Sequence, residues 1–397
     1  MAKLRLGPCG ATMTIAICAV CSGMWRAEAA SYTQTDLVSD ISGLADITDP
    51  ALVNSWGLTS TSTSPFWISD QVTNVATLYS VTGSTNVSKA SPAGTNGNIA
   101  IPPPISSPQQ GPTGAVANTN TSSFLVTAAS GGNGASAHFI FANLNGTISA
   151  WNAGQTAFTQ VTTQGAVYTG LAINEDQNQL YAANNAAGTI DVFNTSFQKT
   201  GTFTTPSGAI PSGLVPFNVQ DIGGNVYVTY APSGGHAAEA GAALGQGAVA
   251  VFSESGTFLR TIATGGTLAS PWGVALAPST FGQFANDLLV GNFSYGHSFI
   301  SAFDPVTGAF EGMIPINTDG NSPGGLWALM FGNMAAGPNT LFFTDGINSE
   351  ADGLFGAIDA TTPLPATLPL FATGLGALGL LGWRRKRKAR VSLLGAA

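Results

Sequence analysis

Short apolar segments rich in aromatic and β-branched residues recur along this chain at nearly regular intervals. Runs of this kind, bounded by glycine, proline, asparagine and serine, predict β-strands. Each group of runs opens on one kind of segment, and the chain contains six such openings: Trp56-Gly57-Leu58, Thr113-Gly114-Ala115-Val116, Thr169-Gly170-Leu171-Ala172-Ile173, Pro216-Phe217-Asn218-Val219, Pro271-Trp272-Gly273-Val274 and Gly325-Leu326-Trp327-Ala328.

Two or three further runs follow each opening. The second runs, predicted as buried strands, are Phe66–Asp70, Phe124–Thr127, Leu180–Ala183, Val226–Thr229, Leu288–Gly291 and Leu341–Thr344. The third runs are Thr77–Tyr79, Ile148–Asn152, Ile190–Asn194, Val249–Ser253, Ile300–Asp304 and Phe355–Asp359. Some groups add a fourth run, as in Phe258–Ile262 and Phe310–Ile314.

The spacing of the openings distinguishes between fold classes. Successive openings lie about 46 to 58 residues apart, enough for a four-stranded antiparallel sheet with its loops. The alternatives are a parallel β-helix, which repeats at roughly 20 to 30 residues, and a β-sandwich, which need not repeat a motif. The sequence therefore predicts an all-β fold: a six-bladed β-propeller of four-stranded antiparallel blades. The last group has no fourth run after Asp359, so we expect Tyr32–Val38 to supply that outer strand and close the ring.

Two segments interrupt the repeat. Ala90–Thr113 contains a run of prolines and is interpreted either as an extended insertion over one face or as a disordered loop. Ala231–Gly247 is rich in glycine and alanine and is interpreted as a flexible hairpin tip between a second and a third strand. It carries His236 and Glu239, and one histidine with one glutamate makes a poor metal site.

Both ends of the chain have the pattern of targeting segments. At the start, Lys3 and Arg5 precede an apolar run and Ala27-Glu28-Ala29-Ala30, which predicts a signal peptide over 1–30. A lipoprotein signal at Cys21 is the alternative. All three cysteines lie in this leader, so the body, residues 31–362, is expected to have no disulfides.

The C-terminal segment combines a proline motif, an uncharged stretch and a basic cluster. The motif is Pro363, Leu364, Pro365 and Ala366, and the cluster is Arg384, Arg385, Lys386, Arg387 and Lys388. The stretch between them is about as long as the shortest membrane-spanning helices, roughly 17 residues. Positive flanking charge is retained on the cytoplasmic side. We therefore expect a single transmembrane helix, an exported body and a cytoplasmic tail at 391–397.

These three features, over 363–390, resemble the PEP-CTERM sorting domain of Gram-negative bacteria. The resemblance implies recognition by an exosortase-type membrane protease and export linked to extracellular polysaccharide. The chain would be held in the inner membrane by its C-terminal helix, then processed and released to the cell surface or the medium. A permanent single-pass anchor is the alternative.

The charge of the body limits its partners. Only Lys89, Lys199 and Arg260 are basic, against nineteen aspartates and glutamates, which leaves a net charge of −16. Binding to nucleic acid or to an anionic membrane surface needs clustered lysine and arginine, so both are excluded. An acidic body favours solubility or the binding of cations.

Candidate catalytic and metal-binding residues are few. None of the three histidines is paired with a plausible nucleophile motif, and there is no phosphate loop. Asp70 and Asp345 end the second strands of the first and last groups, and Asn184 and Asn292 stand at comparable places. These oxygens could converge on the axis and hold Ca²⁺, or they could make turn hydrogen bonds. No other cofactor is expected.

Three tryptophans, Trp56, Trp272 and Trp327, occupy equivalent openings. They could stack on sugars near the channel or pack between blades.

The repeats resemble NHL and gluconolactonase-like six-bladed propellers. Through Leu52–Leu58 and Pro216–Gly224, the whole body resembles a family of exported bacterial propellers without known activity. We therefore predict an envelope or extracellular-matrix protein and favour a binding or structural module over an enzyme. The alternative is a metal-dependent lactonase or hydrolase, although the chain has no clear match to the metal-binding acid and asparagines of the gluconolactonase-like enzymes.

Overall fold

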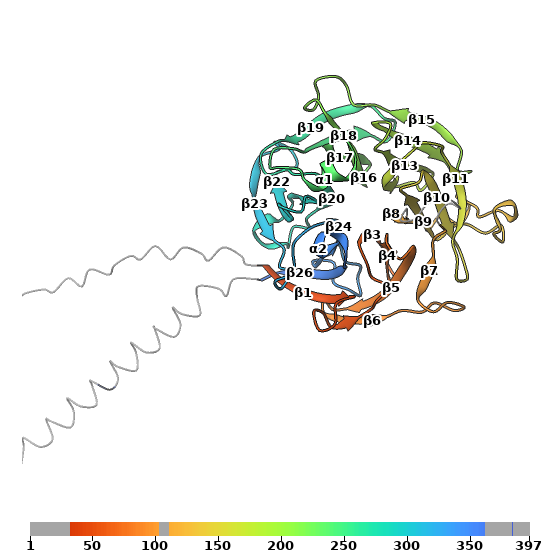
Figure 1. Cartoon of the computed structure of the whole chain (residues 1–397), viewed down its shortest axis with the longest axis horizontal. Coiled ribbons are helices and arrows are strands. Elements are labelled where there is room, and N and C mark those ends of the chain that lie inside the picture. Colours follow the sequence, from red (N-terminus) through yellow and green to blue (C-terminus); the bar gives the residue numbers. More distant parts are fainter. Residues whose placement is uncertain (1–31, 103–110, 362–382, 384–397) are drawn as a thin grey trace, which may run out of the picture. The chain divides into compact units, whose positions relative to one another are not determined.

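Six antiparallel sheets surround one centre in the computed structural model, which describes residues 32–102, 111–361 and Trp383 (Figure 1). The propeller is a compact unit spanning Ala30–Thr362. The leader and the sorting segment lie outside the described residues. Within the described part of the chain, no helix is both long and apolar enough to cross a membrane.

Each sheet is one blade with its strands in chain order from the centre outwards. Blade one consists of β3 (Ser55–Thr59), β4 (Phe66–Asp70), β5 (Val75–Thr82) and β6 (Asn86–Lys89). Blade two consists of β8 (Pro112–Ala117), β9 (Phe139–Asn143), β10 (Thr147–Trp151) and β11 (Phe158–Thr162). Blade three consists of β12 (Tyr168–Ile173), β13 (Gln179–Asn184), β14 (Thr189–Asn194) and β15 (Lys199–Phe203). Blades four and five are β16 (Leu214–Ile222), β17 (Asn225–Pro232), β18 (Ala248–Ser253) and β19 (Phe258–Thr264), then β20 (Pro271–Leu276), β21 (Leu288–Asn292), β22 (Phe299–Phe303) and β23 (Phe310–Pro315). The sixth blade is β24 (Leu326–Phe331), β25 (Leu341–Asp345), β26 (Leu354–Ala360) and β1 (Tyr32–Ser39), with β2 (Ile47–Thr48) parallel to β1. The predicted fold of six four-stranded blades is confirmed.

The six predicted openings are the innermost strands, and their glycines have a steric cause. A Cβ atom on Gly114 would lie 2.3 Å from the backbone nitrogen of Leu171 in the next blade. On Gly273 it would lie 2.3 Å from the carbonyl oxygen of Trp327. Neighbouring inner strands therefore approach too closely for a side chain at these positions, which explains why glycine recurs in the openings.

One predicted strand is wrong. Phe124–Thr127 is not the second strand of blade two, which is β9, because these residues form a loop between β8 and β9. Phe124 has a left-handed φ of 53° and is fully buried against Phe197 of blade three. Val126 is also fully buried, whereas Leu125 is exposed, so buried loop residues here produce the same local pattern as a strand. The 3₁₀ turn η1 (Ala128–Ser130) follows in the same loop.

The two interrupting segments also differ from the sequence interpretation. Part of Ala90–Thr113 forms β7 (Asn98–Ala100), which pairs with β5 and so extends the outer edge of blade one; residues 103–110 lie outside the description. The segment Ala231–Gly247 joins a second and a third strand, as predicted, but it also contains the helix α1 (His236–Ala240). The sequence interpretation, a flexible hairpin tip, did not include this helix. Blade five carries a short 3₁₀ turn, η2 (Gly282–Phe284).

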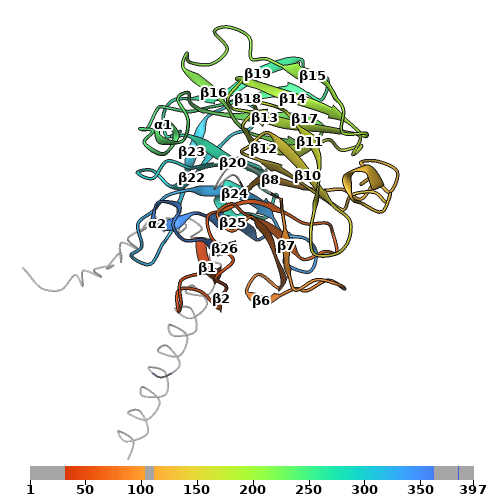
Figure 2. The same cartoon turned by 45° about the vertical axis from the view of Figure 1, so that its right-hand side comes forward.

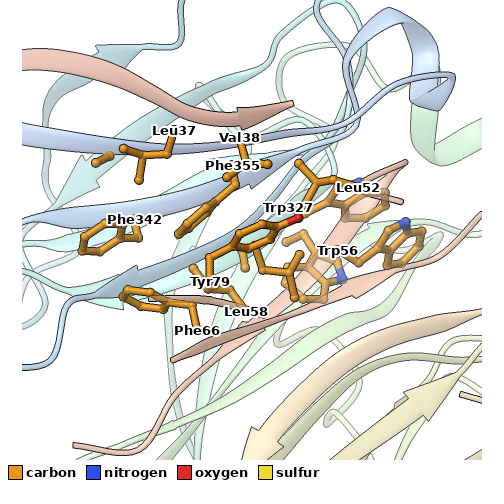
Figure 3. Close-up of a cluster of buried hydrophobic side chains, with 14 of the residues drawn as sticks. Leu37, Val38, Leu52, Trp56, Leu58, Phe66, Tyr79, Trp327, Phe342 and Phe355 are labelled. Atoms are coloured by element: carbon orange, nitrogen blue, oxygen red, sulfur yellow. The ribbon is translucent and has the colours of Figure 1, made fainter. Parts of the chain in front are cut away.

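The ring closes through the N-terminal strand, as predicted. β1 runs antiparallel to β26, with Tyr32 opposite Ala360 and Ser39 opposite Leu354. The register shifts between Asp36 and Val38, so the adjacent residues Leu37 and Val38 are both fully buried. Figure 3 shows them beside Phe355 and Phe342 of blade six, in a cluster that continues to Tyr79 and Phe66 of blade one.

Deleting Tyr32–Val38 should expose the edge of β26 and make the protein self-associate, because an unpaired strand edge is a template for pairing with another chain. Light scattering after size exclusion, with a thermal melt, measures the effect. Leu37→Ala is the matched control: it keeps the strand, should remain monomeric and should lower the free energy of unfolding by about 2–5 kcal/mol. A deletion variant that stays monomeric and equally stable would show that β1 is dispensable.

Candidate functional site

Aromatic side chains fill the centre of the ring. Trp56 stacks on Trp327 with ring centroids 3.5 Å apart, and Trp272 meets both edge-on. Phe293 stacks on the other side of this group, 4.2 Å from Trp327. All three tryptophans are buried, and their packing on one another confirms the packing interpretation of the repeated tryptophans. Trp56 borders one cavity and Trp272 another, at opposite ends of the inner strands.

The main cavity, of about 800 Å³, opens on the face that carries α1 and α2 (Ile347–Glu350), which Figure 2 shows on the same side of the ring. Every blade contributes to its wall. Blade one contributes Asn54, Trp56 and Gln71, blade two Leu144, and blade three Thr169 and Asn185. Blade four contributes His236 and Glu239, blade five Tyr295, and blade six Glu350. The small cavity at the other end has about 230 Å³.

An ion pair between two blades forms one wall of the main cavity. His236 Nε2 lies 2.8 Å from Glu350 Oε2. Tyr295 Oη donates a hydrogen bond of 2.5 Å to the same oxygen, and Asn54 Nδ2 donates one of 3.0 Å to Oε1. The hydrogen bond to Glu350 raises the pKa of His236, against the opposing effect of burial. Glu350 is thus held by three groups from three other blades, and one of them, His236, can neutralise it.

Glu239 is the second carboxyl group of the main cavity and has a different environment. Its exposed fraction is only 4%, and Asn185 Nδ2 donates a hydrogen bond of 2.9 Å to Oε1. Burial raises its pKa to about 7, with a further contribution from the charge of Glu350 and opposing contributions from Asn185 and His236. Near neutral pH this carboxyl is therefore shared between its protonated and ionised forms.

Strained backbone supports the wall that holds Glu350. Asn348, Ser349 and Glu350 have φ values of 54°, 57° and 66°, and Asn54 has a φ of 48°. Left-handed backbone costs a residue with a side chain about 1–2 kcal/mol. Side-chain hydrogen bonds hold the turn, since Asn348 Nδ2 donates to both Asp352 and Asn321. Such strain is concentrated at functional sites in proteins, which marks this turn as part of the candidate site.

The four residues suggested from the sequence as Ca²⁺ ligands lie at the ends of their strands, and three of them form side-chain hydrogen bonds close to their own strands. Asp70 accepts hydrogen bonds from Ser55 Oγ and the Thr77 amide, and Asn184 donates to Asp191. Asn292 accepts from the Ala269 amide and donates to the Thr267 carbonyl. Among the described residues, no three or more His, Cys, Asp or Glu side chains form a group that could hold a metal ion. Ca²⁺ binding by these residues stays a prediction.

The fourth of them, Asp345, is the exception. It is fully buried in blade six, and neither carboxyl oxygen has a hydrogen-bond partner in the described part of the chain. Burial raises its pKa well above the ordinary value, and the charges of Asp36 and Glu350 add to the effect. An unpaired buried carboxyl group of this kind is expected to be protonated.

The sequence did not identify the main cavity. His236 and Glu239 were noticed but assigned to a loop, and Tyr295, Glu350 and Asn54 were not singled out. The position of a residue within the repeat is the signal that could locate the main cavity. Its lining residues Gln71, Asn185, Tyr295 and Glu350 all follow the second strand of their blades. In a propeller those turns share one face, so polar residues there converge.

No family model matches the chain. It is 30% identical over 341 residues to "Uncharacterized protein R648" of Acanthamoeba polyphaga mimivirus, with 81% of this chain and 78% of the relative aligned. It is 26% identical over 344 residues to "Uncharacterized protein L690" of the same virus, covering 84% of this chain and 87% of that protein. Among solved structures, virginiamycin B lyase from Staphylococcus aureus is similar over 83% of this chain and 100% of its own, with 13% identity and a TM-score of 0.48.

Asp345→Asn should stabilise the protein increasingly as the pH rises. The folded pKa of Asp345 is raised, so its contribution to stability is complete below its unfolded pKa and is lost as the pH rises toward the folded value. The variant has no such loss. Its free energy of unfolding should equal that of the parent protein at about pH 4 and exceed it by up to about 1.4 kcal/mol more for each pH unit above that.

Denaturant unfolding at about pH 4, 5.5 and 7 measures this difference. Asp176→Asn, at an exposed position in the turn after β12, is the matched control and should show no comparable trend. A constant difference between Asp345→Asn and the parent protein across this range would contradict the assignment.

Proposed function

Since this chain belongs to the same family as the mimivirus protein "Uncharacterized protein R648", whose name assigns no activity, we propose a function from the site itself: the propeller binds a short saccharide in its main cavity. The observation that carries the proposal is a cavity of about 800 Å³ to which all six blades contribute side chains. Small-molecule sites commonly have volumes of roughly 300–1,000 Å³ and a few convergent polar groups.

The lining chemistry suits a molecule with many hydroxyl groups. Gln71, Asn185 and Glu350 place amide and carboxylate groups on the wall of the main cavity, where they can bond to hydroxyls, and Tyr295 adds aromatic surface. Hydrogen bonds between Asn54 and Glu350, and between Asn185 and Glu239, fix these groups before a ligand arrives. A site ordered in advance loses less conformational entropy on binding.

A binding role is favoured over the alternative, a metal-dependent lactonase or hydrolase. In the described part of the chain, His236 has hydrogen-bond or ionic contacts with Glu350 and Tyr295 and with no serine, threonine or cysteine. The two carboxyl groups of the main cavity already have protein partners and, with His236, make no recognised metal group. The donor set therefore does not fit the metal that a lactonase needs, and we derive no catalytic step from it.

The same proposal includes the location of the protein. A PEP-CTERM-type signal at Pro363–Ala366 and Arg384–Lys388, processed by an exosortase-type protease, would deliver the propeller to the cell surface or the extracellular matrix, where saccharide chains are available. The acidic body, with its three basic residues, supports a neutral or cationic saccharide partner over an acidic one.

Titration of the full chain in detergent with cellobiose, maltose and N,N′-diacetylchitobiose, followed by tryptophan fluorescence and calorimetry, tests the binding proposal. We expect at least one disaccharide to bind, and Tyr295→Phe or Glu350→Gln to weaken it about tenfold or more, because a hydrogen bond to a charged group contributes about 1.5–3 kcal/mol. Gln220→Ala in the small cavity is the matched control and should leave the affinity unchanged. The proposal fails if no disaccharide binds at about 10 mM, tenfold above a weak 1 mM dissociation constant.

Mass spectrometry of the C-terminus in the native host tests the sorting proposal. We expect most molecules to end before Trp383, because prolines disfavour a helix and should keep the motif Pro363–Ala366 available to a protease. Neutral replacements of Arg384–Lys388 should reduce retention of the unprocessed form at the membrane. If the basic cluster remained on most mature molecules, a permanent anchor would be the correct interpretation.

A further inference from the structure

Glu239 differs from every other ionisable group of the main cavity because it lacks a counter-ion. Its Oε1 accepts from Asn185, whereas its Oε2 has no hydrogen-bond partner among the described residues. The side chain is more than nine-tenths buried and lines the main cavity. A carboxylate in this position has lost most of its hydration and has gained only one amide in return.

Among the residues that the structure describes, no basic side chain bonds to Glu239. His236, the basic residue that lines the main cavity in the described part of the chain, is engaged by Glu350 at 2.8 Å. Lys89 pairs with Asp49, Lys199 pairs with Asp191, and Arg260 donates to the backbone carbonyls of Pro305 and Val306. Within the described residues, ionised Glu239 therefore has no cation bonded to it, and a ligand could supply one.

We propose that the main cavity selects a saccharide that carries a protonated amine, and that Glu239 binds the ammonium group. This inference rests on the proposed function, since it names the class of saccharide that the same site takes. Two charged groups act on Glu239 in opposite directions: His236 on its own helix lowers its pKa, and Glu350 on α2 raises it. The ammonium group would thus meet one uncompensated carboxylate at the wall of the main cavity.

A ligand cation also changes the protonation of Glu239. Binding favours the ionised carboxylate, so below about pH 7 the association must release the proton that Glu239 holds in the free protein. The affinity for an amino sugar should therefore fall by up to tenfold for each pH unit below that value. A neutral sugar needs no such release, and its affinity should vary less with pH.

The test compares cellobiose with fully deacetylated chitobiose, which has the same linkage and an amine in place of each 2-hydroxyl. Calorimetry with the full chain at about pH 7 should show chitobiose binding at least tenfold more tightly than cellobiose. Glu239→Gln should remove this preference, because a neutral amide has no charge to offer the ammonium group, while its oxygen can still accept from Asn185. A thermal melt that matches the parent protein shows that the variant is folded.

A second readout follows the proton. At about pH 6, where the sugar amine is fully charged, calorimetry in two buffers of different ionisation enthalpy should detect close to one proton released per chitobiose bound to the parent protein. Glu239→Gln should show none. Glu350→Gln should weaken both disaccharides together.

The outcomes separate the two proposals. Equal affinity for the two disaccharides, or a preference that survives in Glu239→Gln, overturns the amine inference and leaves saccharide binding intact. Failure of both disaccharides to bind, in a protein that also binds no other member of the panel, overturns saccharide binding and the amine inference with it.

Discussion

The pairing of β1 with β26 is the constraint on which the rest of this molecule depends. An open row of six sheets would have no fixed radius, whereas a closed ring of six brings every inner strand to one axis. That radius decides what fits in the centre: glycines where adjacent strands touch, and three tryptophans where space remains. Closure also brings blades one and six together, so Asn54 can hold Glu350. The candidate site is therefore a consequence of closure.

In the main cavity, the residues that stabilise the fold and the polar residues of the candidate site lie on different parts of the blades. Its floor includes the aromatic packing of the inner strands, which is apolar and buried. Its walls come mainly from the turns after the second strands, whose polar side chains bond to one another between blades. The left-handed backbone of Asn348, Ser349 and Glu350 lies in such a turn, and the rigid sheet beneath it offsets the strain.

The sequence predicted the blades well because their signals are periodic and local. Openings, second strands and third strands repeat, and even the displaced closing strand was visible as the run missing after Asp359. Phe124–Thr127 was misassigned because a buried loop anchor and a strand have the same composition. The main cavity was out of reach for another reason: Asn54, His236, Tyr295 and Glu350 are up to 296 residues apart, and only the ring brings them into contact.

The register of β1 also has a consequence for the timing of folding. Ser39 pairs with Leu354, so the first strand to be synthesised has its partner among the last. At a synthesis rate of 5–20 residues per second, roughly 16 to 63 s separate the two. Throughout that interval the chain can form individual blades but cannot complete the ring. The native ring can therefore close only after almost the whole propeller has been synthesised.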